Sequence, residues 1–331
     1  MTLNQLHDRA EGALLGLALG DALGATLEFQ ARDVCPPLTD MVGGGLFELA
    51  PGQWTDDTAM ALCLAHSLVA TGRNDIADQM ARYLRWYREG ENSCLGECFN
   101  IDRTVRRALE LFDQNGNPIA GINADWAAGN GSLVRSAPLA LFFHDAGLAR
   151  AVTGAFVSCV TTHGEQRVIE ACELMAALLH RILNARQSMT KAQLLFELDP
   201  QLDKARANWH PEIQALANGD YRDKSRDDIN SSSYVVHSLE AALWCFCHSE
   251  SFAEGALLAA NLGEDADTIA ALYGQLAGAY YGASALPEVW LDKLYWRECI
   301  SKLATLLLSA NRQSTLLNPK SAEPGLLAKA G

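Results

Sequence analysis

Residues 12–24 read GALLGLALGDALG and place a glycine at every fourth position, at Gly12, Gly16, Gly20 and Gly24. Residues four apart lie on one face of an α-helix, so this segment predicts a helix with a smooth glycine stripe. The segment YGQLAGAYYGA at 273–283 repeats the spacing with Gly274, Gly278 and Gly282. Glycine costs roughly 0.5–1 kcal/mol per helical position relative to alanine. The two stripes therefore indicate helices whose backbones pack closely against a neighbour.

Helix-period patterns also dominate the rest of the chain, and the alternation typical of β-strands is essentially absent. We expect amphipathic helices over residues 58–70, 75–88, 103–113, 138–144, 146–159, 166–184, 190–198, 233–247, 252–262 and 290–309. No tandem repeat or linker marks a domain boundary. The sequence predicts an all-α protein with a single compact multi-helix domain over residues 1–310 and a weakly ordered C-terminal tail over 311–331.

Composition narrows the class of protein. The chain has 331 residues, enough to bury a sizeable core, and 26 Lys and Arg against 40 Asp and Glu give a net charge of −14. This acidity disfavours nucleic acid and anionic membranes as partners, and no apolar run reaches the roughly 18–20 residues of a membrane span. Nine cysteines without the spacing of a zinc module are expected to be buried free thiols. We therefore expect a soluble, cytoplasmic protein.

An acidic cluster, Trp54-Thr55-Asp56-Asp57-Thr58, comes directly before an apolar helical run. The simplest interpretation is a helix start, in which the threonine hydroxyl caps the helix and the acids face the positive end of its dipole. The alternative is that the hydroxyl and both carboxylates converge on a hard cation. Oxygen ligands of this kind favour Mg, Mn or Ca over zinc.

A second cluster, Gly263-Glu264-Asp265-Ala266-Asp267-Thr268, precedes the second glycine-striped helix. The i,i+2 spacing of Asp265 and Asp267 would place them on opposite sides of a helix, which argues for a loop. This cluster is either another elaborate cap or, facing the first one, the other half of a site for two divalent cations. The combined ligands would then be Thr55, Asp56, Asp57, Asp265, Asp267 and Thr268.

Two further features suit an anion or a sugar. The segment Gly129-Asn130-Gly131-Ser132 is either a plain turn or a nest whose glycines allow positive φ and whose N–H groups approach an anion, with Ser132 available as a helix cap and Arg135 close by. His163 is expected in a loop between two helices, where a hydrogen-bonding role and a structural role are equally open.

Six segments in order resemble the ADP-ribosylglycohydrolase family. They are GALLGLALGDALGATLEF at 12–29, GGGLFELAPGQWTDDTAMALCLAHSL at 43–68, GNGSLVRSAPLAL at 129–141, TTHGEQRVIEAC at 161–172, SSYVVHSLEAALWCF at 232–246 and NLGEDADTIAALYGQLAGAYYG at 261–282. The resemblance runs from about residue 8 to 305, and the bacterial branch that resembles dinitrogenase reductase-activating glycohydrolase is the most similar. The pairing of TDD near the start with DxDT near the end is its most specific element.

The resemblance implies an all-α fold with a binuclear Mg or Mn centre in a cleft, and hydrolysis of the bond between ADP-ribose and a modified protein side chain. It implies that the six cluster residues given above are the metal ligands, with Glu28 as a mobile acid above them. It further implies that the loop of Gly129, Asn130, Gly131 and Ser132 holds phosphate or ribose, with His163 nearby and Tyr234 against the adenine.

One segment departs from the family pattern. Where this branch usually reads Phe-Asp-Ile-Gly followed by two threonines, the chain has Phe99-Asn100-Ile101-Asp102-Arg103-Thr104-Val105. The family's acid, which is associated with the arginine end of ADP-ribosyl-arginine, is replaced by Asn100, and Asp102 is new two positions later. The change bears on either rate or leaving-group specificity, and we include both residues among the expected substrate contacts.

The expected activity is a metal-dependent removal of ADP-ribose from ADP-ribosyl-arginine, which reverses ADP-ribosylation of a protein. Cleavage at C1″ passes through an oxocarbenium-like state, and either Asp57 or Glu28 would polarise the water or protonate the departing group. Two alternatives stay open. One is a binding protein that docks onto an ADP-ribosyltransferase or another partner, and the other is a hydrolase of a small ADP-ribosyl metabolite.

Overall fold

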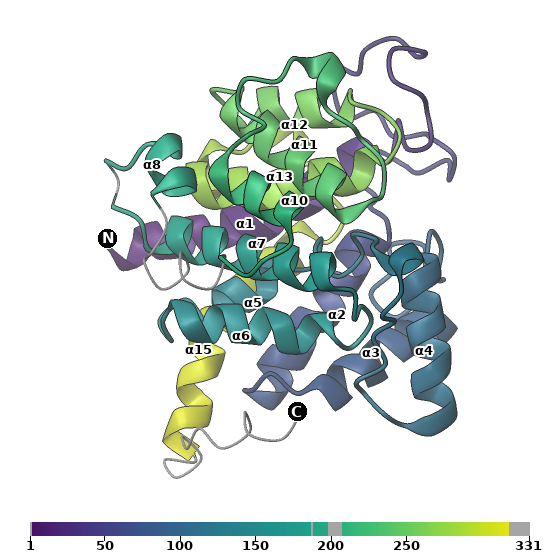
Figure 1. Cartoon of the computed structure of the whole chain (residues 1–331), viewed down its shortest axis with the longest axis vertical. Helices are drawn as coiled ribbons and strands as arrows, with labels where there is room; N and C mark the ends of the chain where they lie inside the picture. The colour runs from purple at the N-terminus through teal and green to yellow at the C-terminus, as the bar shows by residue number, and fades with distance from the viewer. Residues whose placement is uncertain (1, 187, 198–206, 318–331) are drawn as a thin grey trace.

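Two long helices, α1 (Leu3–Gly24) and α13 (Ala266–Tyr281), lie antiparallel at the centre of the molecule (Figure 1). The chain is seen in a computed structural model that describes residues 2–186, 188–197 and 207–317. The two helices carry the two glycine stripes, which pack directly against each other. A Cβ atom on Gly16 would lie 2.2 Å from the carbonyl oxygen of Gly274, and one on Gly278 would lie 1.9 Å from that of Gly12. The expected close backbone approach is therefore confirmed.

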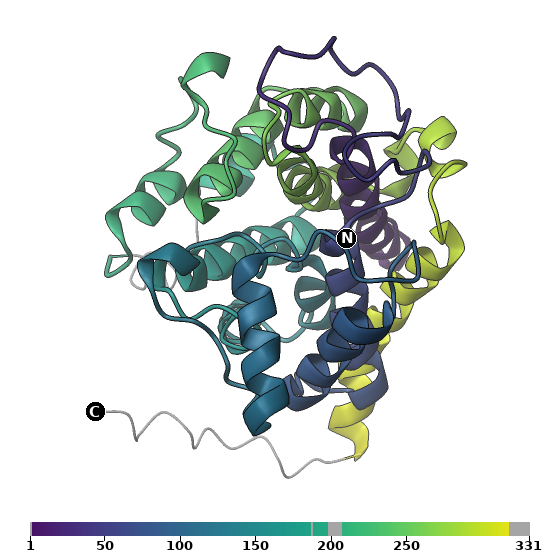
Figure 2. The ribbon, with the colours of Figure 1, turned by 90° about the vertical axis from the view of Figure 1, so that its right-hand side faces the viewer.

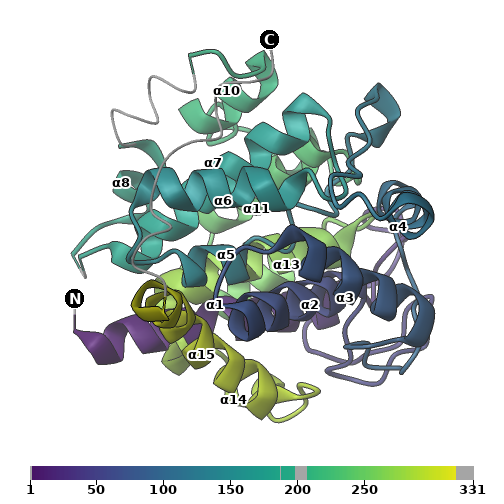
Figure 3. The ribbon, with the colours of Figure 1, turned by 90° about the horizontal axis from the view of Figure 1, so that it is seen from below.

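The remaining helices enclose this pair. α11 (Val235–Cys247) and α12 (Phe252–Ala260) pack on α13, while α15 (Arg297–Leu317) packs on α1 and on α2 (Asp56–Thr71). In Figure 3, α6 (Leu148–Cys159) and α7 (Gln166–Asn184) form a layer on one side of the centre, and α14 (Glu288–Leu291) and α15 lie on the other. Apolar side chains of the described helices form one continuous core between these layers.

The outer helices complete the domain. α3 (Ile76–Glu89) and α4 (Arg103–Asn115) pack against each other beside α2 (Figure 2), α5 (Ala137–Phe142) lies against α7, and two short helices, α8 (Lys191–Phe196) and α10 (Pro211–Asn218), lie beside each other. The 3-10 turns are η1 (Asp125–Ala127), η2 (Arg226–Asp228) and η3 (Ala283–Ala285).

The observed helices differ from the predicted ones in two places. α10 was not expected from periodicity, and the helix expected over 290–309 is split into α14 and α15. Between them Trp296 adopts a left-handed φ of 56°, and the backbone N–H of Tyr295 donates to the carbonyl of Gly52. The break occurs because this turn docks onto the loop before α2, a contact that helical periodicity does not encode. The other expected helices are present with end shifts of a few residues.

Fold class agrees with the prediction. Within residues 2–186, 188–197 and 207–317 the only β-type pairing is three isolated bridges, and no helix there is long and apolar enough to cross a membrane. α15 runs through to Leu317, beyond the domain boundary expected at residue 310. The rest of the expected C-terminal tail, 318–331, lies outside the described residues.

Candidate functional site

The antiparallel register of α1 and α13 brings one end of each helix to the same place. Gly24, at the C-terminal end of α1, lies against Ala266, at the N-terminal end of α13. The loop after α1, the N-terminus of α2 and two loops from the middle of the chain join them there. Together they enclose a cavity of about 200 Å³. Its lining residues are Glu28, Phe29, Asp56, Asp57, Asn100, Ile101, Asp102, Asn130, Gly131, Ser233, Asp265, Asp267 and Thr268.

The N-terminus of α2 is not held by its own threonine. Thr55 occupies the N-cap position but makes no capping hydrogen bond from its side chain. Instead, the buried carboxylate of Asp21 on α1 accepts from the N–H and the hydroxyl of Thr55, and also from the N–H and the hydroxyl of Thr58, at 2.6–2.9 Å. The capping interpretation of Thr55 is therefore wrong, and Asp56 and Asp57 are left to face the cavity.

Asp21 is a functional-site residue that the sequence reasoning missed. It lies within the glycine-striped segment and is fully buried. A single carboxylate inside the otherwise apolar run of residues 12–24 is the signal that could have identified it, because a buried charge needs several hydrogen-bond donors.

The second acidic cluster opens α13 in the same way. Asp265 is at the N-cap position without a capping hydrogen bond, and Asp267 lies in the first turn of the helix. The expectation of a loop at Asp267 is therefore wrong, because a residue in a first helical turn can face the same cavity as the residue before the helix. The Asn130 side chain donates to Asp265 Oδ2 at 2.5 Å and to Ser238 Oγ at 2.7 Å, and so fixes the carboxylate in place.

Asn100 joins the two sides of the cavity. Its Nδ2 donates to Glu28 Oε1 at 2.8 Å and to Asp267 Oδ2 at 3.2 Å. The residue has a left-handed φ of 57°, a conformation that asparagine tolerates better than most residues. An amide at this position therefore links two carboxylates that an aspartate would repel.

The loop that carries Glu28 is tied to the loop that carries Asp265. Phe29 N donates to the carbonyl of Glu264, and Glu264 N donates to the carbonyl of Gln30, at 2.6 and 2.7 Å. Phe29 and Glu264 both have left-handed φ values, 60° and 56°. Non-glycine residues persist in this region when their surroundings determine the backbone, so this paired hydrogen bond sets the distance between the two acidic loops.

Burial and mutual repulsion raise the pKa values of the cavity acids. Burial is the main cause in each case, and neighbouring acids add to it for Glu28, Asp56, Asp57 and Asp267. The pKa of Glu28 rises to about 11 and that of Asp267 to about 8. The pKa of Asp265 rises to about 6, although the hydrogen bond from Asn130 opposes the shift. A cation would relieve this repulsion.

Three of these acids have the properties expected of cation ligands. Glu28 Oε2, Asp57 Oδ2 and Asp267 Oδ1 are buried and have no hydrogen-bond partner. Buried oxygens of this kind need a proton or a cation, and an all-oxygen set suits Mg or Mn. Within the described part of the chain, no three His, Cys, Asp or Glu side chains are grouped tightly enough to hold an ion as they stand. The buried, unpartnered oxygens nevertheless fit a hard divalent cation by their chemistry.

The loop at 129–132 borders the cavity only in part. Asn130 and Gly131 line it, whereas Ser132 turns away, with its hydroxyl 3.4 Å from the sulfurs of Cys159 and Cys172. Ser132 does not cap a helix, and neither Gly129 nor Gly131 has the positive φ expected for a nest. Packing of the hydroxyl among buried cysteines explains its direction.

His163 lies directly behind this loop, fully buried. Arg135 donates to the hydroxyl of Thr162 at 2.7 Å, and the same hydroxyl is hydrogen-bonded to His163 Nδ1 at 2.8 Å. The other ring nitrogen, Nε2, has no hydrogen-bond partner and lies 3.9 Å from Asp102 Oδ2. Burial lowers the pKa of His163 to about 4, so the ring is neutral at pH 7.

Two other residues have roles that differ from expectation. The Arg135 guanidinium is buried, donates to the carbonyl of Gly131 and lies over the ring of Tyr83, so it supports the loop and does not reach into the cavity. Tyr234 lies outside the residues that line the cavity, next to Ser233, which lines it. Its hydroxyl donates to Glu212 Oε2 and accepts from Arg167, which leaves the ring at the rim.

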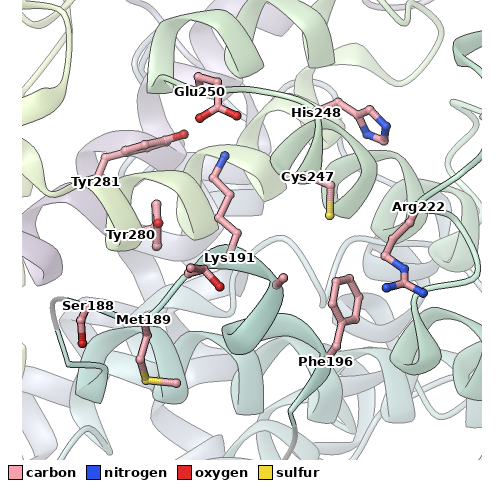
Figure 4. A pocket seen from close by; sticks show the side chains of 12 residues that line it. Ser188, Met189, Lys191, Phe196, Arg222, Cys247, His248, Glu250, Tyr280 and Tyr281 are labelled. Carbon is pink, nitrogen blue, oxygen red and sulfur yellow. The ribbon is translucent and has the colours of Figure 1, made fainter.

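A larger groove of about 680 Å³ lies elsewhere, between α8 and the C-terminal ends of α11 and α13 (Figure 4). Its lysine, Lys191, donates to the carbonyl oxygens of Phe246 and Ser249 and lies within 6 Å of three aromatic ring centres. Lys191 therefore provides hydrogen bonds to carbonyl groups at and just after the end of α11. Six acidic side chains line the smaller cavity and one lines the larger groove, which identifies the smaller cavity as the candidate active site.

Fold and site together define an all-α protein with buried carboxylates at two facing helix N-termini. Residues 2–316 match the model of the ADP-ribosylglycohydrolase family. "ADP-ribosylarginine hydrolase Tri1" of Pseudomonas putida is 45% identical over 92% of this chain and 79% of its own length, and the protein of the same name from Serratia proteamaculans is 43% identical over 91% and 79%.

Two further comparisons agree. "ADP-ribosyl-[dinitrogen reductase] glycohydrolase" of Rhodospirillum rubrum is 33% identical over 89% of this chain and 92% of its own length. A solved structure described as "ADP-ribosylglycohydrolase-related protein complex" superposes with a TM-score of 0.79 and 42% identity, covering 93% of this chain and all of the other. The chain belongs to the ADP-ribosylglycohydrolase family, which confirms the resemblance expected from the sequence.

Proposed function

We propose that this chain is a metal-dependent hydrolase that removes ADP-ribose from arginine side chains of ADP-ribosylated proteins. The observation that carries the proposal is the convergence of Glu28 and two acidic helix N-termini on one cavity, in a chain 45% identical to a protein named as an ADP-ribosylarginine hydrolase. The nine cysteines are free thiols, which suits the reducing cytoplasm in which we place the protein.

Two divalent cations, Mg or Mn, would be held by Thr55, Asp56, Asp57, Asp265, Asp267 and Thr268. The buried, unpartnered oxygens of Asp57 and Asp267 support this assignment. Bound cations of this type supply charge stabilisation and lower the pKa of water. The hydrogen bonds that Thr55 donates to Asp21 and that Asn130 donates to Asp265 would hold the ligands in position.

Glu28 and Asp57 are the proposed acid and base. The raised pKa of Glu28 suits it to donate the proton that the nitrogen leaving group requires, and Asp57, which lies in the first turn of α2 and lines the same cavity, would act as the base. Asn100, through its hydrogen bond to Glu28 Oε1, orients that carboxyl group.

The ADP-ribose would extend from the acids toward the loop of residues 129–131. Asn130 and Gly131 line the cavity on this side with His163 behind them, and Tyr234 at the rim is the proposed contact for adenine. We assign Ser132 an indirect role, since its hydroxyl faces the two buried cysteines.

The test is release of free ADP-ribose. The purified protein is incubated with arginine-, serine- and base-linked ADP-ribose substrates, each with Mg, with Mn and with a chelator. Release from the arginine-linked substrate that depends on the cation supports the proposal. Equal release in chelator contradicts the metal assignment, and release from the other linkages alone contradicts the substrate assignment.

Docking onto an ADP-ribosyltransferase and hydrolysis of a small ADP-ribosyl metabolite remain the other hypotheses. The names of the similar proteins favour hydrolysis of ADP-ribosyl-arginine over docking. An Asp56→Ala variant that no longer releases ADP-ribose but still inhibits a transferase would support docking as a second activity.

A further inference from the structure

One carboxylate on the cavity wall stands apart from the two acidic clusters. Asp102 comes from the N-terminus of α4, lines the cavity and has a side chain that is 35% exposed. The other cavity acids are Glu28, Asp56, Asp57, Asp265 and Asp267, and each of these belongs to the proposed metal and proton-transfer machinery. Asp102 is therefore the one acid of the cavity lining that is free of these roles and can bind a cationic leaving group.

The capping role of Asp102 occupies one of its two oxygens. Oδ2 accepts from the N–H groups of Thr104 and Val105 at 2.8 and 3.0 Å. Among the described residues, the hydrogen bonds to this side chain all end on Oδ2, so Oδ1 is available to a ligand. The cap also fixes the rotamer, because the side chain has to stay folded over the first turn of α4.

The charge of Asp102 is not neutralised by its neighbours. His163 lies 3.9 Å away but is neutral, since its pKa is lowered to about 4. The guanidinium of the next residue, Arg103, lies over the ring of Trp126, 4.4 Å from its centre. On the cavity side, Asn100 is an amide already engaged with Glu28, and Ile101 is apolar.

The walls beside Asp102 suit an alkyl guanidinium. Ile101 and Phe29 line the same cavity, and Phe29 is 60% exposed at its mouth. Planar guanidinium groups pack on apolar and aromatic faces while they donate to a carboxylate at their edge. An arginine side chain that enters past Phe29 can therefore place its charged end against Asp102.

We propose that Asp102 is the specificity-determining residue that receives the guanidinium of the modified arginine, through a charge-assisted hydrogen bond to Oδ1. The proposal rests on the proposed function and deepens it, because it names the residue that distinguishes an arginine from an uncharged side chain. Hydrogen bonds to charged groups are strong enough for a 10- to 100-fold effect on kcat/KM.

The test uses Asp102→Asn and Asp102→Ser, which both keep a capping side chain but remove the charge. Asp113→Asn, at the other end of α4, is the matched control for loss of one negative charge. In the presence of Mn, we expect both Asp102 variants to lose about 10- to 100-fold in kcat/KM on arginine-linked ADP-ribose, mainly through KM. Inhibition by agmatine, which carries the alkyl guanidinium without the ADP-ribose, should weaken by the same factor.

Binding of ADP-ribose itself is the discriminating measurement, because this ligand has no guanidinium. We expect its Kd to change by less than about threefold in the Asp102 variants. Equal losses for ADP-ribose and agmatine would show that Asp102 only shapes the loop, and unchanged agmatine inhibition would also overturn the proposal. A wild-type protein that binds ADP-ribose but releases none from arginine would instead contradict the proposed function, and with it this role.

Discussion

Asp21 accepts two hydrogen bonds from Thr55, one from its backbone N–H and one from its hydroxyl, each at 2.9 Å. The two residues are 34 positions apart in sequence; Asp21 lies in α1, and Thr55 is the N-cap residue of α2. α2 is therefore capped by a carboxylate from the central glycine-striped helix. The consequence is that the first turn of α2, with Asp56 and Asp57, is fixed relative to α1 and not by its own sequence.

We expect Asp21→Asn to destabilise the protein by about 2–4 kcal/mol, because the amide presents a donor to groups that are themselves donors and leaves buried polar atoms unpaired. Denaturant unfolding followed by circular dichroism measures the loss. The variant should also bind Mn more weakly, as seen by isothermal titration calorimetry. Thr58→Val, which removes one of the four donors, is the milder comparison. Wild-type stability in Asp21→Asn would contradict the capping role.

We expect Gly20→Ala to lower the melting temperature. A Cβ atom on Gly20 would lie 2.0 Å from the carbonyl oxygen of Ala270, so α1 and α13 would have to separate. Overpacking of this kind costs roughly 1–3 kcal/mol. At an unconstrained helical position the same substitution stabilises by roughly 0.5–1 kcal/mol. The sign of the change in melting temperature therefore decides whether the stripe is a backbone contact.

We expect the protein in a chelator to lose stability as the pH rises. Asp265 and Asp267 have folded-state pKa values raised from 3.8 to about 6 and about 8. An acid with a raised folded-state pKa contributes its full stability below the unfolded value of about 3.8, and that contribution is lost as the pH rises through the folded value. Urea unfolding between pH 5 and pH 8 should show the decline, and added Mn should reduce it.

The result that would contradict this prediction is a chelated protein whose free energy of unfolding rises from pH 5 to pH 8. Carboxyl groups with lowered pKa values are ionised in both the folded and the unfolded protein above pH 5, so they add no slope in this range; a rise would come from buried histidines such as His163, whose pKa is lowered to about 4. Glu28, with a pKa of about 11, should stay protonated across this range in the chelated protein.

We expect Asp57→Asn to separate stability from activity. The substitution removes one of several mutually repelling acids, so the chelated protein should become more stable at pH 8. It also removes a proposed cation ligand, so release of ADP-ribose should fall at least about 100-fold and stabilisation by Mn should disappear. Thermal unfolding with and without Mn, beside the release assay, measures both. Full activity of the Asp57→Asn variant would contradict the proposed roles of Asp57 as a cation ligand and as the base.

Most of the helices and both acidic clusters could be identified from the sequence alone. Helical periodicity and capping are local, so the segments that became α7 and α11 could be placed closely from their residues alone. The glycine stripes also predicted a close backbone approach. What they could not give is the partner of each stripe, because the pairing of Gly16 with Gly274 depends on how the whole domain packs.

Side-chain direction within the site was less predictable. Ser132 was expected to face a ligand and faces Cys159 and Cys172, while Arg135 supports a loop. Asn100 was singled out as a departure, but its link between Glu28 and Asp267 became visible only in three dimensions. Apart from the Gly131 carbonyl, which is close to Arg135 in sequence, the partners in these hydrogen bonds lie more than 25 residues away.

By itself, the sequence determined that this protein is helical and which two segments pack closely through their backbones. It also identified the two acidic clusters as candidate site residues among the many acids of the chain. The tertiary structure alone decided that Asp21 caps α2, that Trp296 interrupts the last helix and that Asp102, which caps α4, lies in the cavity wall. The reason is physical. Helix formation follows from neighbours within a few residues, whereas the hydrogen bonds of a buried polar group depend on whichever donors packing brings to it.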